Sequence, residues 1–280
     1  MNQVSHSVKE YTIKRFIKNL PVYCLEAWGL GTFMISAVFF TILLEHPASS
    51  LNALIPSVFL RRTISGVMMG LTAIAIIYSP WGKRSGAHMN PAFTIAFYMM
   101  KKISLFDAAF YILFQFLGGL LGVVIFDLIA LGYVTDIHVN HAITTPQNMP
   151  YGVPLAFIME LLISFGLMWM VLFTNSNEKL TRYTGIFAGI MIFLYITFEA
   201  PFSGMSMNPA RTVASALPAM EWNGIWIYFI APLAGMLLAV ELFFLGKKNH
   251  EKNVCAKFIN TNCNQCIFLN CQCMTNNERN

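Results

Sequence analysis

The chain has 280 residues, of which 56% are hydrophobic and 11% are charged, and its formal net charge at pH 7 is +5. A soluble domain carries about 25% charged residues, so this composition excludes a soluble protein and predicts a chain that crosses a membrane several times. Nucleic-acid binding is also excluded, because lysine and arginine lie scattered between apolar runs instead of forming one basic face.

Six apolar stretches are long enough to span a bilayer as helices, which takes about 20 residues each. They do not alternate apolar and polar residues, as the strands of a membrane barrel would. We therefore expect an all-α membrane protein with six transmembrane helices, at Pro21–Leu44, Thr63–Gly82, Ala108–Val134, Val153–Thr174, Tyr183–Ala200 and Trp222–Gly246.

Lysine and arginine are distributed unevenly between the loops. With the N-terminus inside the cell, 15 of the 18 fall in the inside segments 1–20, 81–102, 175–182 and 247–280. The positive-inside rule then predicts a multi-pass protein of the plasma (inner) membrane with both termini in the cytoplasm. Arg61 and Arg62 oppose the rule, and we expect them to anchor the second helix at the membrane interface.

Two shorter apolar runs, Met89–Met100 and Met207–Met220, each begin with Asn-Pro after a Ser-Gly turn and are too short to span. The ten residues that start at Ser85 match the ten that start at Ser203 at seven positions. This repeat predicts two inverted halves, about 21–134 and 153–246, each with three helices and one re-entrant half-helix. The apolar body 21–246 lies between an N-terminal segment, 1–20, and a cysteine-rich tail, 247–280.

Inversion allows the N-termini of the two half-helices to meet near the membrane midplane. Asparagine is a good N-cap and proline is favoured at the first helical position. The asparagine amides would then face a shared path, and the alanines are small enough for the two caps to touch. The residues concerned are Asn90, Pro91, Ala92, Asn208, Pro209 and Ala210.

This doubled Asn-Pro-Ala motif, followed in its second copy by Arg211, resembles the aquaporin (major intrinsic protein) family over about residues 20–246. The resemblance implies an aquaporin-like fold, one pore in each subunit, a homotetramer in the lipid bilayer and no cofactor. It also implies a passive channel, not an enzyme, that conducts water and excludes protons and ions. The alternative is a channel mainly for glycerol or another small uncharged solute.

The resemblance also implies a selectivity filter. Carried over by spacing, its residues are Arg211, Ile196, Met205 and either Met69 or Gly70. Ile196 stands where strict water channels usually have histidine, and Thr212 stands where glycerol channels usually have aspartate. The filter matches neither pattern, so we expect water conduction with slower passage of small neutral solutes.

Four polar residues fall inside or beside the apolar stretches: Glu26, Gln115, Glu160 and His88. A charge at bilayer depth costs roughly 3 kcal/mol on insertion scales, so the glutamates must face the interior and be hydrogen-bonded. We expect Glu26, Glu160 and Gln115 to hold the re-entrant backbones, and His88 to shape the cytoplasmic vestibule. A proton relay through the glutamates and a pH gate at His88 are the alternatives.

Three other classes of protein remain as rivals. An ion-coupled transporter would need acidic residues at the half-helix ends, and neither Asn90 nor Asn208 has one beside it. A membrane enzyme would need a nucleophile–base pair or a metal-ligand cluster among the apolar stretches, and we find neither. A structural junction protein could use the same fold without conduction.

The tail offers a weak metal-site candidate, because thiolates bind soft metals such as zinc. Its members are Cys263, Cys266, Cys271 and Cys273. Their spacing is irregular and includes no histidine. We expect instead a reduced, disordered tail whose removal leaves the permeability unchanged.

Overall fold

The structure is a computed structural model that describes residues 2–245, 254–259 and 266–269. Within these residues the chain is helical and contains no strand, which confirms the all-α fold. Six of the helices are long and apolar enough to cross a membrane: α1 (Asn2–Glu45), α3 (Val58–Tyr78), α6 (Leu105–Ile129), α7 (Gly152–Asn175), α8 (Thr184–Phe198) and α11 (Ile227–Phe244).

Two of the spanning helices begin well before their predicted starts. The first is α1, which begins at Asn2 instead of Pro21. The second is α3. It begins five residues before Thr63, because the Ser57 side chain accepts a hydrogen bond from the backbone N–H of Leu60 and caps the helix there. It ends at Tyr78, where Ser79 caps the short helix α4 (Pro80–Ser85). The proline at the start of α4 has no N–H to continue the preceding helix.

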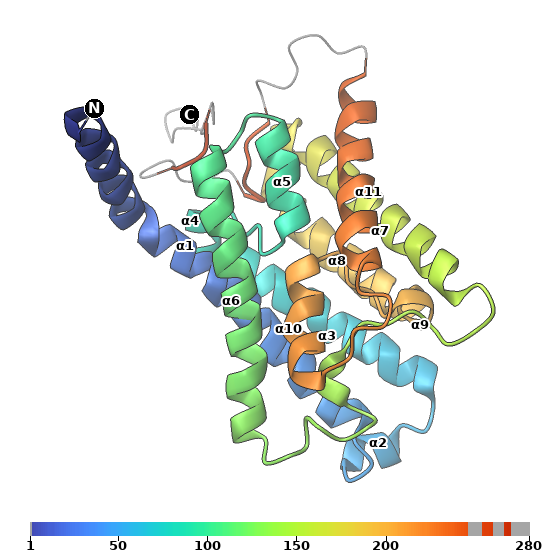
Figure 1. Ribbon diagram of the computed structural model, residues 1–280. Coiled ribbons are helices and arrows are strands. Elements are labelled where there is room, and N and C mark those ends of the chain that lie inside the picture. Colours follow the sequence, from blue (N-terminus) through green and yellow to red (C-terminus); the bar gives the residue numbers. More distant parts are fainter. Residues whose placement is uncertain (1, 246–253, 260–265, 270–280) are drawn as a thin grey trace.

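The two half-helices are α5 (Pro91–Met99) and α10 (Pro209–Ala219). Figure 1 shows α5 at the end of the bundle from which α1 starts, and α10 toward the opposite end. The N-termini of both half-helices therefore point toward the middle of the bundle. The remaining short elements are α2 (Ser50–Leu54), α9 (Ala200–Ser203) and the 3₁₀ turns at Asn140–Ala142 and Thr181–Tyr183.

The long helices pack in the pairs α1 with α6, α3 with α8 and α7 with α11. A buried carboxylate fastens the first pair near the start of α6. Asp107 accepts hydrogen bonds from Arg15, Asn19 and Tyr23 on α1, at 2.5, 2.9 and 2.6 Å. Charge-assisted bonds of this kind are about twice as strong as neutral ones, so they fix the register of α6 on α1.

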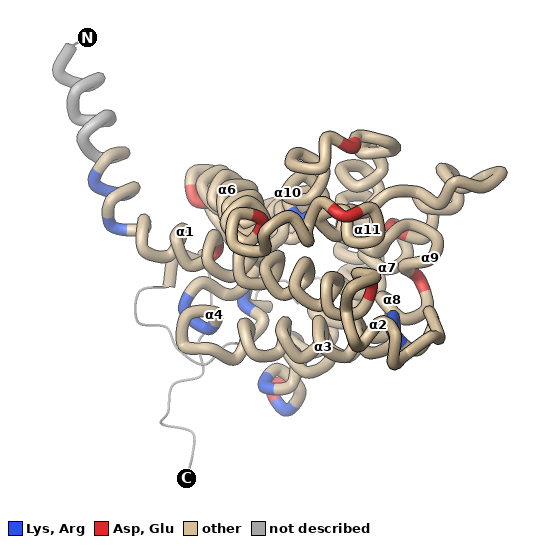
Figure 2. The backbone as a smooth tube through the Cα atoms, turned by 90° about the horizontal axis from the view of Figure 1, so that it is seen from below, with Lys and Arg blue, Asp and Glu red and all other residues tan. Residues whose placement is uncertain are grey.

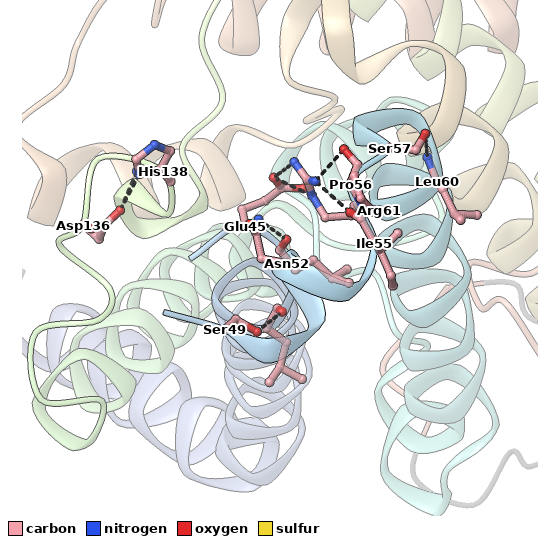
Figure 3. Close-up of polar contacts among 12 residues, drawn as sticks. Glu45, Ser49, Asn52, Ile55, Pro56, Ser57, Leu60, Arg61, Asp136 and His138 are labelled. Atoms are coloured by element: carbon pink, nitrogen blue, oxygen red, sulfur yellow. Dashed lines mark hydrogen bonds and ion pairs between the residues drawn. The ribbon is translucent and has the colours of Figure 1, made fainter. Parts of the chain in front are cut away.

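Charged residues are sparse along the tube in Figure 2, and basic residues gather at α4 and near the beginning of α1. Arg61 and Arg62, the expected interfacial anchors, both bind other parts of the chain. Arg61 donates to Glu45 at 2.9 Å and to the carbonyls of Ile55 and Pro56 (Figure 3). Arg62 donates to the carbonyl of Thr197 at 2.8 Å. Both charges are used to hold loops and helices to one another.

Candidate functional site: two asparagine caps on one cavity

The two re-entrant loops repeat not only their sequence but also their backbone conformation. Gly86 and Gly204 both have positive φ, at 90° and 81°. Two non-glycine residues in each loop also lie in the left-handed region: Ala87 and Met89 in the first, Met205 and Met207 in the second. Such residues are uncommon outside glycine, so their recurrence at equal spacing shows that each loop is held in one specific shape.

The asparagines cap the half-helices and also join the two loops. The side-chain oxygen of Asn90 accepts from the N–H of Ala92 at 2.9 Å, and that of Asn208 accepts from the N–H of Ala210 at 3.0 Å. Each amide NH₂ donates across the interface, Asn90 to the carbonyl of Met207 and Asn208 to the carbonyl of Met89, both at 2.7 Å. An NH₂ group carries two hydrogens, so each asparagine keeps a second N–H for the cavity that it lines.

Two fully buried glutamates hold the loop backbones. Glu26 accepts from the N–H groups of His88 and Met89, at 3.1 and 2.6 Å. Glu160 accepts from the N–H groups of Ser206 and Met207, both at 2.7 Å. The bonded positions are equivalent in the two repeats. These bonds turn the N–H groups away from the cavity and satisfy backbone that would otherwise be unpaired inside a membrane.

Other buried side chains also bind the two re-entrant loops, and the two tyrosines among them do so at equivalent positions. Tyr111 donates to the carbonyl of Ser85 at 2.8 Å, and Tyr228 donates to the carbonyl of Ser203 at 2.5 Å. Gln115, also fully buried, donates to Glu26 at 2.8 Å and to Thr94 at 3.1 Å. The loops are therefore fixed from α6 and α11 as well as from α1 and α7.

A cavity of about 330 Å³ runs along both loops. Every third or fourth residue of α1 and of α3 lines it, which is one face of each helix. On α1 the lining residues are Leu30, Phe33, Ala37, Thr41 and Glu45; on α3 they are Val58, Arg62, Ser65, Met69, Ala73 and Ile77. Each stripe covers at least 15 residues of helical rise, which is about 22 Å and hence most of the thickness of a bilayer core.

The sequence-derived filter positions can now be placed. Arg211, Ile196, Met205 and Met69 all line the cavity. Gly70 instead faces α8, where an added Cβ would lie 2.5 Å from the carbonyl oxygen of Gly189. Gly70 therefore serves close helix packing, and Met69 is the cavity residue of the two. The Arg211 guanidinium donates to the carbonyl of Ala142 at 2.8 Å, which fixes its position at the wall.

The model of the family described as "Major intrinsic protein" matches residues 23–243. The chain belongs to the major intrinsic protein family. It is an integral multi-pass membrane protein, and proteins of this family are passive channels and not enzymes.

Individual relatives agree with this assignment. The chain is 32% identical to aquaporin NIP3-1 of Arabidopsis thaliana over 212 residues, which are 72% of this chain and 63% of that protein. It is 33% identical to mouse (Mus musculus) aquaporin-4 over 181 residues, 61% of this chain and 52% of the relative. The matches thus span less than two thirds of the length of these relatives.

A solved structure shares the fold. The X-ray structure of the aquaglyceroporin from Plasmodium falciparum superposes with a TM-score of 0.67, over 81% of this chain and 96% of that chain, at 18% sequence identity. Six spanning helices and two half-helices in an inverted repeat are therefore the architecture of this major intrinsic protein.

Several cavity residues were missed by sequence reasoning. Thr41, Glu45, Arg62 and Ser65 line the cavity at the end away from His88 and Ile77. Their signal is in the sequence, because they continue the spaced stripes of α1 and α3 toward the helix ends. Phe258, which was also missed, comes from the tail and has no such signal.

Sequence reasoning also missed Glu199, a buried acid close to Glu160 at the second re-entrant loop. The Ser203 hydroxyl lies 2.7 Å from Oε1 of Glu160 and 2.5 Å from Oε1 of Glu199, yet it has only one hydrogen to donate. Both oxygens of Glu160 already accept backbone N–H bonds. The second proton therefore belongs to Glu199, which donates to Ser203 as Ser203 donates to Glu160. Burial, together with the charge of Glu160, raises the pKa of Glu199 to about 8.

The tail differs from the expectation of a reduced, disordered extension. Cys255 is buried and disulfide-bonded, whereas Cys24 and Cys266 are free. Of the candidate metal ligands, Cys263, Cys271 and Cys273 lie outside the described residues. Within the part of the chain that the structure describes, no group of three metal-ligating side chains comes together.

Proposed function

We propose that this protein is a passive transmembrane channel for water that also passes small neutral solutes more slowly. The observation that carries the proposal is the cavity that runs past both asparagine caps between the half-helix N-termini. A path of this length, lined by spaced residues of α1 and α3, suits molecules that move in single file.

Water would be oriented at the centre of the channel. The second N–H of Asn90 and that of Asn208 can both donate to one water oxygen, because both amides line the cavity. An oxygen that accepts two such bonds cannot relay a proton to the next water. The positive ends of the two half-helix dipoles add an electrostatic barrier to protons and cations.

The filter is proposed to consist of Arg211, Ile196, Met205 and Met69. The guanidinium supplies hydrogen-bond donors on one side, and the other three side chains are apolar. A small polyol could turn its hydroxyl groups to Arg211 and its carbon edge to the apolar wall. Water also fits but finds fewer partners there. The apolar wall is the specific observation that favours the second candidate, a channel mainly for glycerol or a similar uncharged solute.

The surroundings of the channel are part of the proposal. Basic residues favour the cytoplasm for the end of the bundle that carries α4, and for both termini, in the plasma (inner) membrane. An impermeant thiol reagent should then label the tail only after cells are permeabilised. We also propose a homotetramer, as the family resemblance implies, which the detergent-corrected mass from light scattering would test.

Light scattering of proteoliposomes tests conduction directly. Vesicles with and without the protein are shocked first with sucrose and then with glycerol. The proposal expects faster shrinkage than in empty vesicles, followed under glycerol by slower re-swelling as solute enters. Equal shrinkage rates in loaded and empty vesicles, for the full chain and for a chain without residues 247–280, would contradict it.

A further inference from the structure

Residues 254–259, here called the tail strap, are buried although they follow the last spanning helix. Five of the six are exposed by 3% or less: Val254, Cys255, Ala256, Lys257 and Ile259. Figure 1 shows one described piece of the tail beside α5, at the end of the bundle from which α1 starts. An extension that lay free in solvent would keep its side chains exposed to water.

Hydrogen bonds tie the tail to three different parts of the channel body. The carbonyl of Ala256 lies 2.8 Å from Nε2 of His88, and the N–H of Phe258 donates to the carbonyl of Gly86 at 3.2 Å. The side chain of Asn175, at the end of α7, donates to the carbonyl of Lys257 at 2.8 Å. Further along the tail, the N–H of residue 269 donates to the carbonyl of residue 102 at 2.7 Å.

Aromatic contacts place the strap on the pore axis. Phe258 stacks on Phe93, with ring centroids 5.0 Å apart and planes at 18°, and it lines the same cavity as Asn90 and Asn208. Phe268 packs against His88 at 5.2 Å and against Tyr111 at 6.1 Å. Gly86 permits this close approach, because a Cβ there would lie 3.0 Å from the ring of Phe268.

We propose that the tail strap is an autoinhibitory plug that closes the pore at its first re-entrant loop, with Phe258 as the blocking side chain. The inference rests on the proposed channel function. The strap binds the first re-entrant loop at Gly86 and His88, and its Phe258 lines the cavity together with Ala87, His88 and Phe93. A conducting pore needs water at this position, so the strap has to leave before a continuous file of water can form.

The contacts are suited to a reversible closure. The apolar side chains of Val254, Phe258 and Ile259 favour docking, because they leave water when the strap is in place. The polar groups that bind the strap, namely His88, Asn175 and the carbonyl of Gly86, can all be satisfied by water once it leaves. These groups therefore have partners in both states, so the two states can be close in free energy.

Water permeability per reconstituted channel tests the plug. The set comprises the full chain, a chain without residues 247–280, the Phe258→Ala variant and the Phe268→Ala variant as a matched control. Phe268 belongs to the same tail but does not line the cavity. If the strap holds about 90% of channels closed, its removal raises permeability roughly tenfold. Phe258→Ala should raise it by a smaller factor and Phe268→Ala by less again.

A peptide provides a second measurement that does not depend on comparing different preparations. A synthetic peptide of residues 247–280 is added to both faces of vesicles that hold the truncated channel. The proposal expects the peptide to restore closure and the same peptide carrying Phe258→Ala to restore it less. An effect equal for both peptides would overturn the role of Phe258.

The results separate the plug from the channel function. Equal permeability of the full chain, the truncated chain and Phe258→Ala, all above empty vesicles, would overturn the plug and leave the channel. Absence of conduction in all forms would overturn both. If the truncated chain does not assemble, the comparison of Phe258→Ala with Phe268→Ala in the full chain still decides.

Discussion

The first and second re-entrant loops share one construction but meet different surroundings. In each, a buried glutamate binds two backbone N–H groups, a tyrosine binds a loop carbonyl, and an asparagine donates to the opposite loop at 2.7 Å. This framework depends on positions that are identical in the two copies of the motif or equivalent in the two halves.

The three positions that differ between the two copies determine which side chains line the cavity at each loop. Ala87, His88 and Phe93 in the first loop correspond to Met205, Ser206 and Arg211 in the second, and all six line the cavity. Phe93 stacks on the tail, whereas Arg211, its counterpart, donates to the carbonyl of Ala142. The repeat thus builds the scaffold, and under our proposals its few departures provide a closing surface at one end and a filter at the other.

Removal of the shared support should have the largest effect. Glu160→Gln replaces one carboxylate oxygen, which accepts a backbone N–H bond, with an NH₂ group that can only donate. Each buried group left unpaired costs roughly 1–3 kcal/mol. We expect loss of monodisperse protein on size-exclusion chromatography, or a large fall in melting temperature. Glu26→Gln should behave alike, because Glu26 has the equivalent role.

Glu199→Gln is the matched control for that prediction. Its amide can donate to Ser203 as the protonated acid does, so we expect assembly close to that of the unmodified protein. Wild-type stability in Glu160→Gln, or failure of Glu199→Gln, would contradict the assignment of the proton to Glu199.

The asparagine pair provides the next largest effect. Asn208→Asp removes the donor to the carbonyl of Met89 and places a negative charge at the junction of the two half-helix dipoles. We expect reduced water permeability together with a new cation leak, measured by potassium flux across the vesicle membrane. The reciprocal bonds predict a similar result for Asn90→Asp. Ion-tight, normal water flow in both variants would argue against the central position of the two caps.

Much of this framework could be predicted from the sequence, because it rests on local rules. The six spans followed from apolar length, and the half-helices followed from proline next to an asparagine cap. The inverted repeat followed from seven identities in ten residues. The start of α3 was missed because the signal there is a single serine cap, whereas hydropathy averages over many residues.

Contacts between distant parts of the chain could not be predicted in the same way. The burial of the tail depends on Phe258 fitting beside Phe93, which are 165 residues apart in the chain. The pair of Arg61 with Glu45 joins two different helices, so no single segment indicates it. The choice between Met69 and Gly70 needed the position of Gly189 on α8. The hydrophobic periodicity of a single segment does not indicate which distant residues it contacts.

Selectivity offers a smaller effect that concerns the second loop alone. Ile196→His adds a polar group and bulk on the apolar side of the filter, opposite Arg211. We expect the ratio of glycerol to water permeability to fall several-fold, measured on the same vesicles. Ile196→Val, which stays apolar, should leave the ratio unchanged or raise it. An unchanged ratio in Ile196→His would show that Ile196 does not form the filter.

The last prediction concerns how the second loop depends on pH, because its support contains an acid that the first loop lacks. An isolated glutamate ionises near pH 4.5, whereas Glu199 in the folded protein keeps its proton up to about pH 8. Between these two pH values the folded state therefore binds more protons than the unfolded state. This group stabilises the fold fully below pH 4.5 and loses that contribution as the pH rises to 8.

The Glu199→Gln variant tests this dependence, because glutamine cannot ionise in either state. Melting temperatures of the two proteins in detergent should therefore be similar at acidic pH, and the variant should become the more stable one above pH 8. Titrations of all other groups occur in both proteins and cancel in the difference. Parallel melting curves across this range would show that Glu199 is already ionised in the folded channel, and the proton between Glu199 and Ser203 would have to be assigned to Glu160 instead.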